Sequence, residues 1–166
     1  MNQMTNGVWI PYFSAIAASA AALTGLIFVA VSINLSAIVK QAWLADRAAE
    51  SLMQLMGALI IATYPLIPQQ PLVALGVELL ATATLLWSIQ TWLQVQYLRG
   101  RLGHPLHWGA IRVVQTQLAH IPLFAGGILL LLSAPQEGFY CMAAGLTLSM
   151  IAGVANAWVL LVEILR

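Results

Sequence analysis

Two side chains in this sequence combine ionisable chemistry with strongly apolar surroundings. Glu78 lies within the run VALGVELLATATLLW, where no basic residue is close in sequence. His120 lies within TQLAHIPLF, and Pro122 follows it and removes a helical hydrogen bond beside the imidazole. Ionisable groups inside apolar segments are costly and usually face an interior, a partner or water. We therefore take Glu78 and His120 as candidate ion- or proton-binding residues. Glu78 could instead be a neutral acid bonded to a backbone carbonyl, face water, or meet a polar group such as His120.

A second polar group follows helical spacing. Arg47, Glu50 and Gln54 lie three and four residues apart, which places them on one face of a helix. The spacing predicts a structural ion pair between Arg47 and Glu50. Asn34 and Asn156 are expected at a similar or slightly greater depth in neighbouring helices. The alternative interpretation is a gate near the cytoplasmic surface.

The composition decides which elements must position these side chains. The chain has 166 residues, of which 61% are hydrophobic and 7% are charged. A soluble domain carries about 25% charged residues, so this chain cannot cover itself with a water-facing surface. A soluble enzyme, a nucleic-acid-binding protein and a disordered regulator are excluded. The whole chain, residues 1–166, is predicted to be one integral membrane domain.

Five segments are long and apolar enough to cross a bilayer, which needs about 20 residues. They span residues 9–39, 43–66, 72–98, 110–133 and 139–165, and they predict an all-α bundle. With five spans, all Lys and Arg residues fall on one side of the membrane: Lys40, Arg47, Arg99, Arg101, Arg112 and Arg166. The positive-inside rule then predicts an outside N-terminus and a cytoplasmic C-terminus in a bacterial inner membrane.

Three arginines flank the connector between the third and fourth segments. Arg99, Arg101 and Arg112 are expected at the inner membrane surface, where they would attract anionic lipid headgroups. The lipid bilayer is therefore a predicted partner of this region.

Small residues at four-residue spacing occur in the first and fifth segments. Such rows let helix backbones approach closely in a membrane. We expect the first and fifth segments to pack together on these faces, within one subunit or between subunits. The rows are Ala17, Ala21 and Gly25 in the first segment, and Gly145, Ser149, Gly153 and Ala157 in the fifth.

Motifs of enzyme active sites do not occur. The sequence lacks a glycine-rich phosphate loop, the H-E-x-x-H motif of metalloproteases and a C-x-x-C redox pair, and Cys141 is its single cysteine. We therefore expect no catalytic residues, no cofactor, no metal site and no nucleic-acid partner.

Three stretches in the first half of the chain carry a resemblance. They are AALTGLIFVAVSINL, RAAESLMQLMGALI and PQQPLVALGVE. They resemble the T-G-L-x-F-V-A-x-S-I/L-N-L, R-A-A-E and P-x-Q…G-x-E segments of a group of small bacterial multi-span membrane proteins with no established activity. The resemblance implies no function, but Thr24, Asn34, Arg47, Glu50, Gln69 and Glu78 fit its pattern.

Two hypotheses for function follow. The first is a homo-oligomeric ion channel or pore, because a five-helix chain has little interior of its own and narrow pores are commonly lined where subunits meet. Glu78 and the neighbouring Thr82 and Thr84 would line the outer half, and Asn34, Glu50 and Arg47 would lie near the inner mouth. The second is an accessory or assembly subunit of a larger membrane complex, in which the small-residue faces bind partner helices. A transporter is disfavoured because no internal repeat is visible.

Overall fold

The computed structural model describes residues 2–99 and 106–164, and within these ranges the chain is helical and has no strand. Five helices are long and apolar enough to cross a membrane, as the sequence predicts, which indicates a multi-pass membrane protein. The elements are α1 (Asn2–Ile33), α2 (Leu35–Ile38), α3 (Ala42–Thr63), the 3₁₀ turn η1 (Tyr64–Leu66), α4 (Leu72–Arg99), α5 (Leu106–Leu131) and α6 (Pro135–Ile164).

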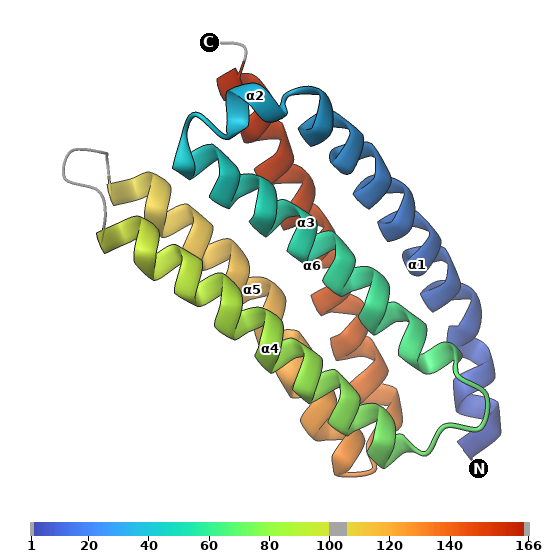
Figure 1. The fold of residues 1–166 in the computed structure, drawn as a ribbon. Coiled ribbons are helices and arrows are strands. Elements are labelled where there is room, and N and C mark those ends of the chain that lie inside the picture. Colours follow the sequence, from blue (N-terminus) through green and yellow to red (C-terminus); the bar gives the residue numbers. More distant parts are fainter. Residues whose placement is uncertain (1, 100–105, 165–166) are drawn as a thin grey trace.

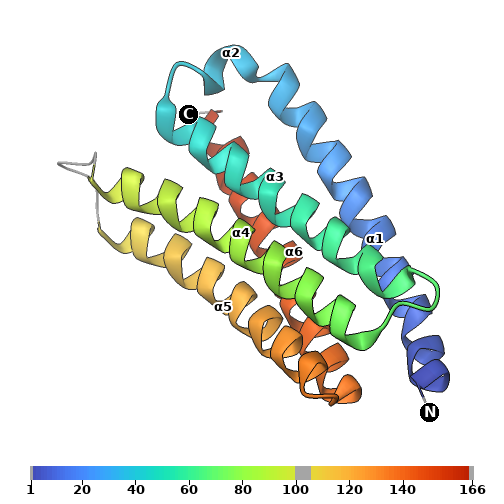
Figure 2. The ribbon, with the colours of Figure 1, turned by 60° about the horizontal axis from the view of Figure 1, so that its bottom comes forward.

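Four of the long helices form a closed ring, and the fifth lies outside it. Helices α3, α4, α5 and α6 each pack against two neighbours in the ring, whereas α1 packs mainly along α3 (Figure 1). The two ends of the chain lie at opposite ends of the bundle, as an odd number of spans requires (Figures 1 and 2).

The two ends of the bundle differ in composition. One end holds the start of α1, the proline-containing loop of residues 65–71 and the turn between α5 and α6; we call it the proline end. The other holds α2, the start of α3, the end of α4, the start of α5 and the end of α6; we call it the basic end, because Lys40, Arg47, Arg99 and Arg112 lie there.

The half of the bundle nearer the proline end has an apolar interior. Trp9 on α1 lies 5.9 Å from Phe139 and 4.8 Å from Tyr140 on α6, measured between ring centroids. Aromatic and aliphatic side chains fill the space between these rings and the middle of the bundle. The buried members are Phe13, Ala17, Ala20, Ala58, Ile61, Ala62, Leu75, Leu79, Ala83, Leu123, Leu130, Phe139, Met142 and Leu146.

The first predicted segment is not one straight helix to residue 39. Asn34 interrupts it, with backbone angles φ −100° and ψ 13°, and the short helix α2 follows. The Asn34 side-chain amide donates to the Ala30 carbonyl at 2.9 Å, and the Asn34 backbone N–H bonds to the same carbonyl. Asparagine competes with regular helical bonding in this way, which explains the break. Helix α1 also begins earlier than predicted, so Pro11 lies inside it.

The small residues of α6 pack inside the bundle, mainly against α3 and α5. Gly145 meets Leu123 and the Ala119 carbonyl of α5, and Gly153 meets Leu55 and the Ser51 carbonyl of α3. Ser149 and Ala157 are also buried. Ala157 clusters with Ile27 of α1 and Leu55 of α3. Within one subunit the expected packing of the first and fifth segments is therefore found at Ala157 but not at Gly145 or Gly153, and packing between subunits stays a prediction.

On α1 the predicted row is only partly used. Ala17 is buried, whereas Ala21 and Gly25 are exposed, and nothing lies within 4 Å of a Cβ built on Gly25. Helix α1 contacts α6 near the proline end, where Tyr12 donates to the Ala143 carbonyl at 3.2 Å. Further along, an apolar groove of about 680 Å³ opens beside Leu23 of α1 and Met150, Val154 and Trp158 of α6.

Candidate functional site

The half of the bundle nearer the basic end has a polar interior, which we call the polar cluster. All four ring helices contribute to it. Within the described residues, no buried polar side chain lies closer to the proline end than His120 and Ser149, which stand near the midpoints of α5 and α6. The members are Arg47, Glu50, Ser51, Gln54, Gln90, Gln94, Arg112, Thr116, His120, Ser149 and Asn156, each at most 5% exposed.

An ion pair between Arg112 and Glu50 links α5 to α3 across the ring of four helices. Arg112 Nη2 lies 2.7 Å from Glu50 Oε1, and Arg112 Nε donates to Glu50 Oε2 at 3.1 Å. The Tyr97 ring lies against the guanidinium, with 4.3 Å from Arg112 Cζ to the ring centroid. The structure thus corrects two predictions: Arg112 is buried rather than at the headgroups, and Glu50 pairs with Arg112. Arg47 is also buried, and its charge acts on the same carboxylate.

Hydrogen bonds extend the cluster along α5. Gln94 Nε2 of α4 donates to Thr116 Oγ1 at 2.7 Å, and Thr116 Oγ1 lies 3.1 Å from the Arg112 carbonyl of its own helix. His120 Nδ1 lies 2.9 Å from the Thr116 carbonyl oxygen, so this nitrogen carries the proton and donates. Helix α5 runs continuously through Pro122, so His120 is held by its own helix and not by a broken one.

On the α3–α6 side, the cluster bonds across the two helices. Asn156 Nδ2 donates to Gln54 Oε1 at 3.3 Å, and Ser51 Oγ donates to the Gly153 carbonyl at 2.7 Å. The second bond is possible because Gly153 has no side chain to separate the two backbones. Asn156 therefore lies in the bundle interior beside Gln54.

Glu78 lies apart from the polar cluster, near the proline end. It is the seventh residue of α4, about 9 Å along the helix axis from Leu72. Gln70 Nε2 donates to Glu78 Oε2 at 2.5 Å, so the partner is a loop side chain rather than His120 or a backbone carbonyl. Tyr64, the first residue of η1, makes a second link to α4, with 2.6 Å between the hydroxyl oxygens of Tyr64 and Thr82.

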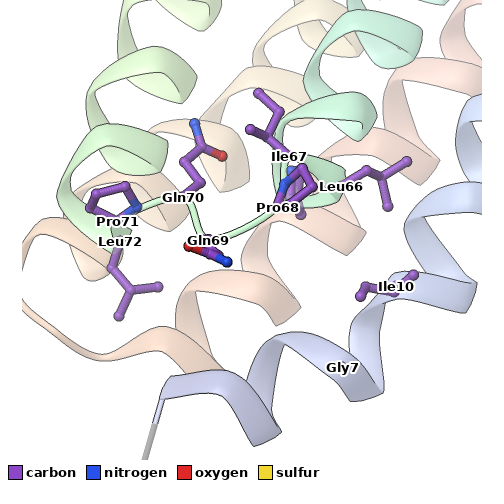
Figure 3. Close-up of a pocket in the computed structure, with 10 residues that line it drawn as sticks. Gly7, Ile10, Leu66, Ile67, Pro68, Gln69, Gln70, Pro71 and Leu72 are labelled. Atoms are coloured by element: carbon purple, nitrogen blue, oxygen red, sulfur yellow. The ribbon is translucent and has the colours of Figure 1, made fainter.

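The same loop borders a recess at the surface of the proline end. Its volume is about 490 Å³, and Gly7 and Ile10 of α1 line it together with residues 65–72. Figure 3 shows that Gln70 and Leu72 leave the loop on opposite sides. Gln69 adopts a positive φ of 57° in the tight turn between Pro68 and Pro71. Gln69 thus shapes the loop, and Gln70 fixes it to Glu78.

A second groove runs along the outward face of α4. It has a volume of about 580 Å³ and is lined by Val77, Leu80, Ala81, Thr84, Leu85 and Ser88. Thr84 and Ser88 are exposed, and the Ser88 hydroxyl donates to the Thr84 carbonyl at 2.7 Å. Glu78 is half-buried and lies at the edge of this face, three residues before Ala81.

The remaining predicted residues belong neither to the polar cluster nor to the surroundings of Glu78. The Asn34 amide bonds within its own helix and is half-buried. Arg99 is exposed in the last turn of α4, where a headgroup contact stays a prediction. Arg101 lies outside the described residues. Within the described residues, no group of three or more His, Cys, Asp and Glu side chains could hold a metal ion.

Sequence reasoning missed part of the cluster. Gln90 and Gln94 lie one turn apart on α4, and Arg112, Thr116 and His120 lie one turn apart on α5. Polar residues repeated at four-residue steps inside an apolar span are the signal that could have found them.

Comparison of the chain with models of protein families, with curated proteins and with solved structures gives no match in any of the three. The functional argument therefore depends on the geometry of this chain alone.

Proposed function

We propose that this chain forms a homo-oligomeric ion channel or pore in a bacterial inner membrane, with Glu78 in the pathway. The proline end would face outward, and the basic end would face the cytoplasm. The side that holds Lys40, Arg47, Arg99 and Arg112 is the one that the positive-inside rule assigns to the cytoplasm.

One observation carries the proposal: the outer half offers polar groups on its surface while its interior is filled by apolar side chains. Leu79, Ala83, Leu123 and Leu146 are almost fully buried there. A polar path through this half would therefore run outside the ring of four helices. The outward face of α4 suits such a path, because the groove with Thr84 and Ser88 lies beside Glu78.

Subunit contact would turn this face into a pore wall. Hydroxyl and carboxylate groups that face lipid make no favourable polar contacts, whereas between subunits they can contact ions or water. The inner mouth predicted from Asn34, Glu50 and Arg47 needs revision, because Glu50 and Arg47 are buried within a single subunit. We place the pore along α4 instead.

Flux from liposomes that contain the purified protein tests this proposal. Glu78→Gln keeps an oxygen that can accept from Gln70 but removes the charge, and Thr84→Val removes a hydroxyl from the groove. We expect both variants to change ion flux. The matched control is Glu137→Gln, which removes an exposed acid of the first turn of α6 at the same end. Flux that is unchanged in Glu78→Gln contradicts the proposal.

A second candidate function is an accessory subunit of a larger membrane complex. It is favoured by α1, whose outward face carries the small exposed residues Ser14, Ala18 and Ala22. Such a face suits a partner helix. Native mass spectrometry after gentle extraction separates the two: a single homo-oligomeric mass supports the pore, and other polypeptides at a fixed ratio support the accessory role.

A further inference from the structure

The polar cluster contains an amide group without a hydrogen-bond partner in the protein. Gln90 is 1% exposed, yet within the described part of the chain neither its Nε2 nor its Oε1 is hydrogen-bonded. Buried amides are almost always bonded, and more strictly so in a membrane, where lipid cannot take the place of water. Gln90 therefore indicates that a polar partner other than a protein group binds beside it.

His120 of α5 lies at the height of Gln90 on α4. Gln94 Nε2 donates to Thr116 Oγ1 where these two helices pack together, and Gln90 and His120 each lie one turn from that bond toward the proline end. His120 is also buried, and its Nδ1 donates to the Thr116 carbonyl. Its Nε2 therefore remains as a hydrogen-bond acceptor.

Gln54 of α3 lies at this height as well. A Cβ built on Gly57 would touch the Leu86 side chain, so these two residues of the antiparallel helices α3 and α4 are adjacent. Counted from this contact toward the basic end, Gln54 and Gln90 lie within about one residue of the same height. Gln54 Oε1 accepts from Asn156, but the buried Gln54 Nε2 has no partner among the described residues. We call Gln54, Gln90 and His120 the middle layer.

The middle layer borders polar residues on one side and apolar residues on the other. Toward the basic end, Glu50 and Arg112 meet across the ring. Toward the proline end, Ala83 and Leu123 are at most 2% exposed and belong to the apolar core. A polar guest therefore reaches the middle layer from the basic end and does not continue beyond it.

The free groups of the middle layer favour a guest that both donates and accepts hydrogen bonds. The donors are Nε2 of Gln54 and Nε2 of Gln90, and the acceptors are Oε1 of Gln90 and Nε2 of His120. An anion would leave both acceptors without a partner, and a cation would leave both donors without one. Water satisfies both kinds of group, and a buried water typically makes about three hydrogen bonds to such groups.

We propose that Gln54, Gln90 and His120 bind buried water at the middle of each subunit. The amides of both glutamines end flexible side chains, so small rotations toward the ring axis admit a guest of the size of water. The water gives His120 Nε2 a partner with which to exchange a proton. Because the apolar core stops the water at this level, the site is separate from the pore along α4 and does not depend on conduction.

Nuclear magnetic resonance of the purified full-length protein in detergent micelles tests the site, with isotope labels in the glutamine and histidine side chains. Rotating-frame cross-relaxation distinguishes contact with water from hydrogen exchange, because the two signals have opposite sign. We expect a contact signal at the side-chain amides of Gln90 and Gln54 and at the ring of His120. The hydroxyl protons of Thr91 and Thr116 could imitate water, so the Gln90 signal should persist in Thr91→Val and in Thr116→Val.

Variants assign the signal to this site. Gln90→Leu should abolish the water contact at the Gln54 amide, and Gln90→Met, which matches the length of glutamine, is a second variant if leucine packs poorly. Gln96→Leu makes the same change at an exposed position of α4 and should keep the contact.

Three results overturn the proposal. The first is no water contact at the Gln90 amide of the unmodified protein. The second is a direct contact between the amide protons of Gln54 and Gln90, which would show that the two side chains bond to each other. The third is an unchanged Gln54 signal in both Gln90 variants, which would place the water elsewhere. Because water contact is measured directly, absent ion flux in liposomes leaves the site intact.

Discussion

The two halves of the ring of helices α3–α6 have opposite interiors. Toward the proline end, Leu79, Leu123 and Met142 fill an apolar core. Toward the basic end, the same four helices enclose Glu50, Arg112, Gln90 and other polar side chains that are equally buried. Since the backbone architecture is shared, the difference lies in the side chains alone.

From this difference we infer that the interior of the apolar half stabilises the bundle and that the interior of the polar half carries a function. The apolar half packs by close backbone approach, for example where a Cβ on Gly126 would lie 3.0 Å from the Gly138 carbonyl oxygen. The polar half buries an ion pair, and a buried ion pair is weak evidence for stability because desolvation can exceed its attraction. Polar groups inside a membrane domain are a functional-site hypothesis by default. The predictions below test this division, from the largest expected effect to the smallest.

The largest effect is expected when the ion pair loses one partner. Glu50→Leu leaves the Arg112 guanidinium buried without its carboxylate, which should lower the free energy of unfolding by about 3–5 kcal/mol. Replacing both residues by leucine should recover most of this loss. Unfolding by a denaturing detergent in mixed micelles measures the change. Arg99→Leu, at an exposed arginine, is the control, with an expected change within about 0.5 kcal/mol. A Glu50→Leu protein as stable as this control would show that the ion pair is not structural.

The next effect concerns the close approach of backbones in the apolar half. Gly126→Ala forces its Cβ against the Gly138 carbonyl and the Met142 nitrogen, so we expect a loss of about 1–3 kcal/mol. Gly25→Ala on α1 meets nothing within 4 Å and should be neutral or stabilising by up to about 1 kcal/mol, because alanine favours a helix. The same unfolding assay compares them. Equal losses would mean that Gly25 also contacts something, which would favour a partner on α1.

A smaller contrast separates the two buried glutamines of α4. Gln94→Leu removes the hydrogen bond to Thr116 and should cost about 1 kcal/mol. Gln90→Leu removes an amide without a protein partner, so it should be neutral or stabilising by about 1 kcal/mol. Unfolding by a denaturing detergent in mixed micelles measures both. A Gln90→Leu protein that is less stable than Gln94→Leu would show that Gln90 has a structural partner.

The smallest effect on stability is expected at Glu78. Glu78→Gln preserves an acceptor for Gln70 and should change the free energy of unfolding by less than about 1 kcal/mol. Glu78→Leu removes the acceptor and should cost about 1 kcal/mol more than Glu78→Gln. Measuring both separates the loop contact from any effect on flux. If Glu78→Gln is the less stable of the two, the link to Gln70 does not hold the loop.

The sequence predicted the elements better than their contacts. The five spans follow from apolar length, and the structure contains five helices that meet this criterion. The sequence identified the small face of α6 but not its partners α3 and α5. A repeat of small residues predicts that another helix approaches closely, but it does not say which helix this is.

The ion pair shows the same limit. Arg47 and Glu50 share a helix face, so local spacing suggested that they pair, whereas the partner in the structure is 62 residues away. Arg112 adjoins a polar connector, which made it resemble a headgroup anchor. Only the folding of α3 and α5 into one four-helix ring, across which Arg112 reaches α3, brings it to Glu50. The loop contact of Gln70 with Glu78 likewise depends on the turn geometry of residues 67–71, which spacing alone does not give.

The central claim is that polar solutes reach the interior of the basic half and not that of the apolar half. Single cysteines at Gln90 and Ala83, two turns apart on α4 and both buried, compare the two interiors directly once Cys141 is replaced by alanine. The measurement is the rate of modification by a small, anionic, water-soluble thiol reagent in membrane vesicles with the basic end exposed to it. We predict that the cysteine at position 90 reacts and that the one at position 83 does not. Equal rates, or faster reaction at position 83, would contradict the division into two halves.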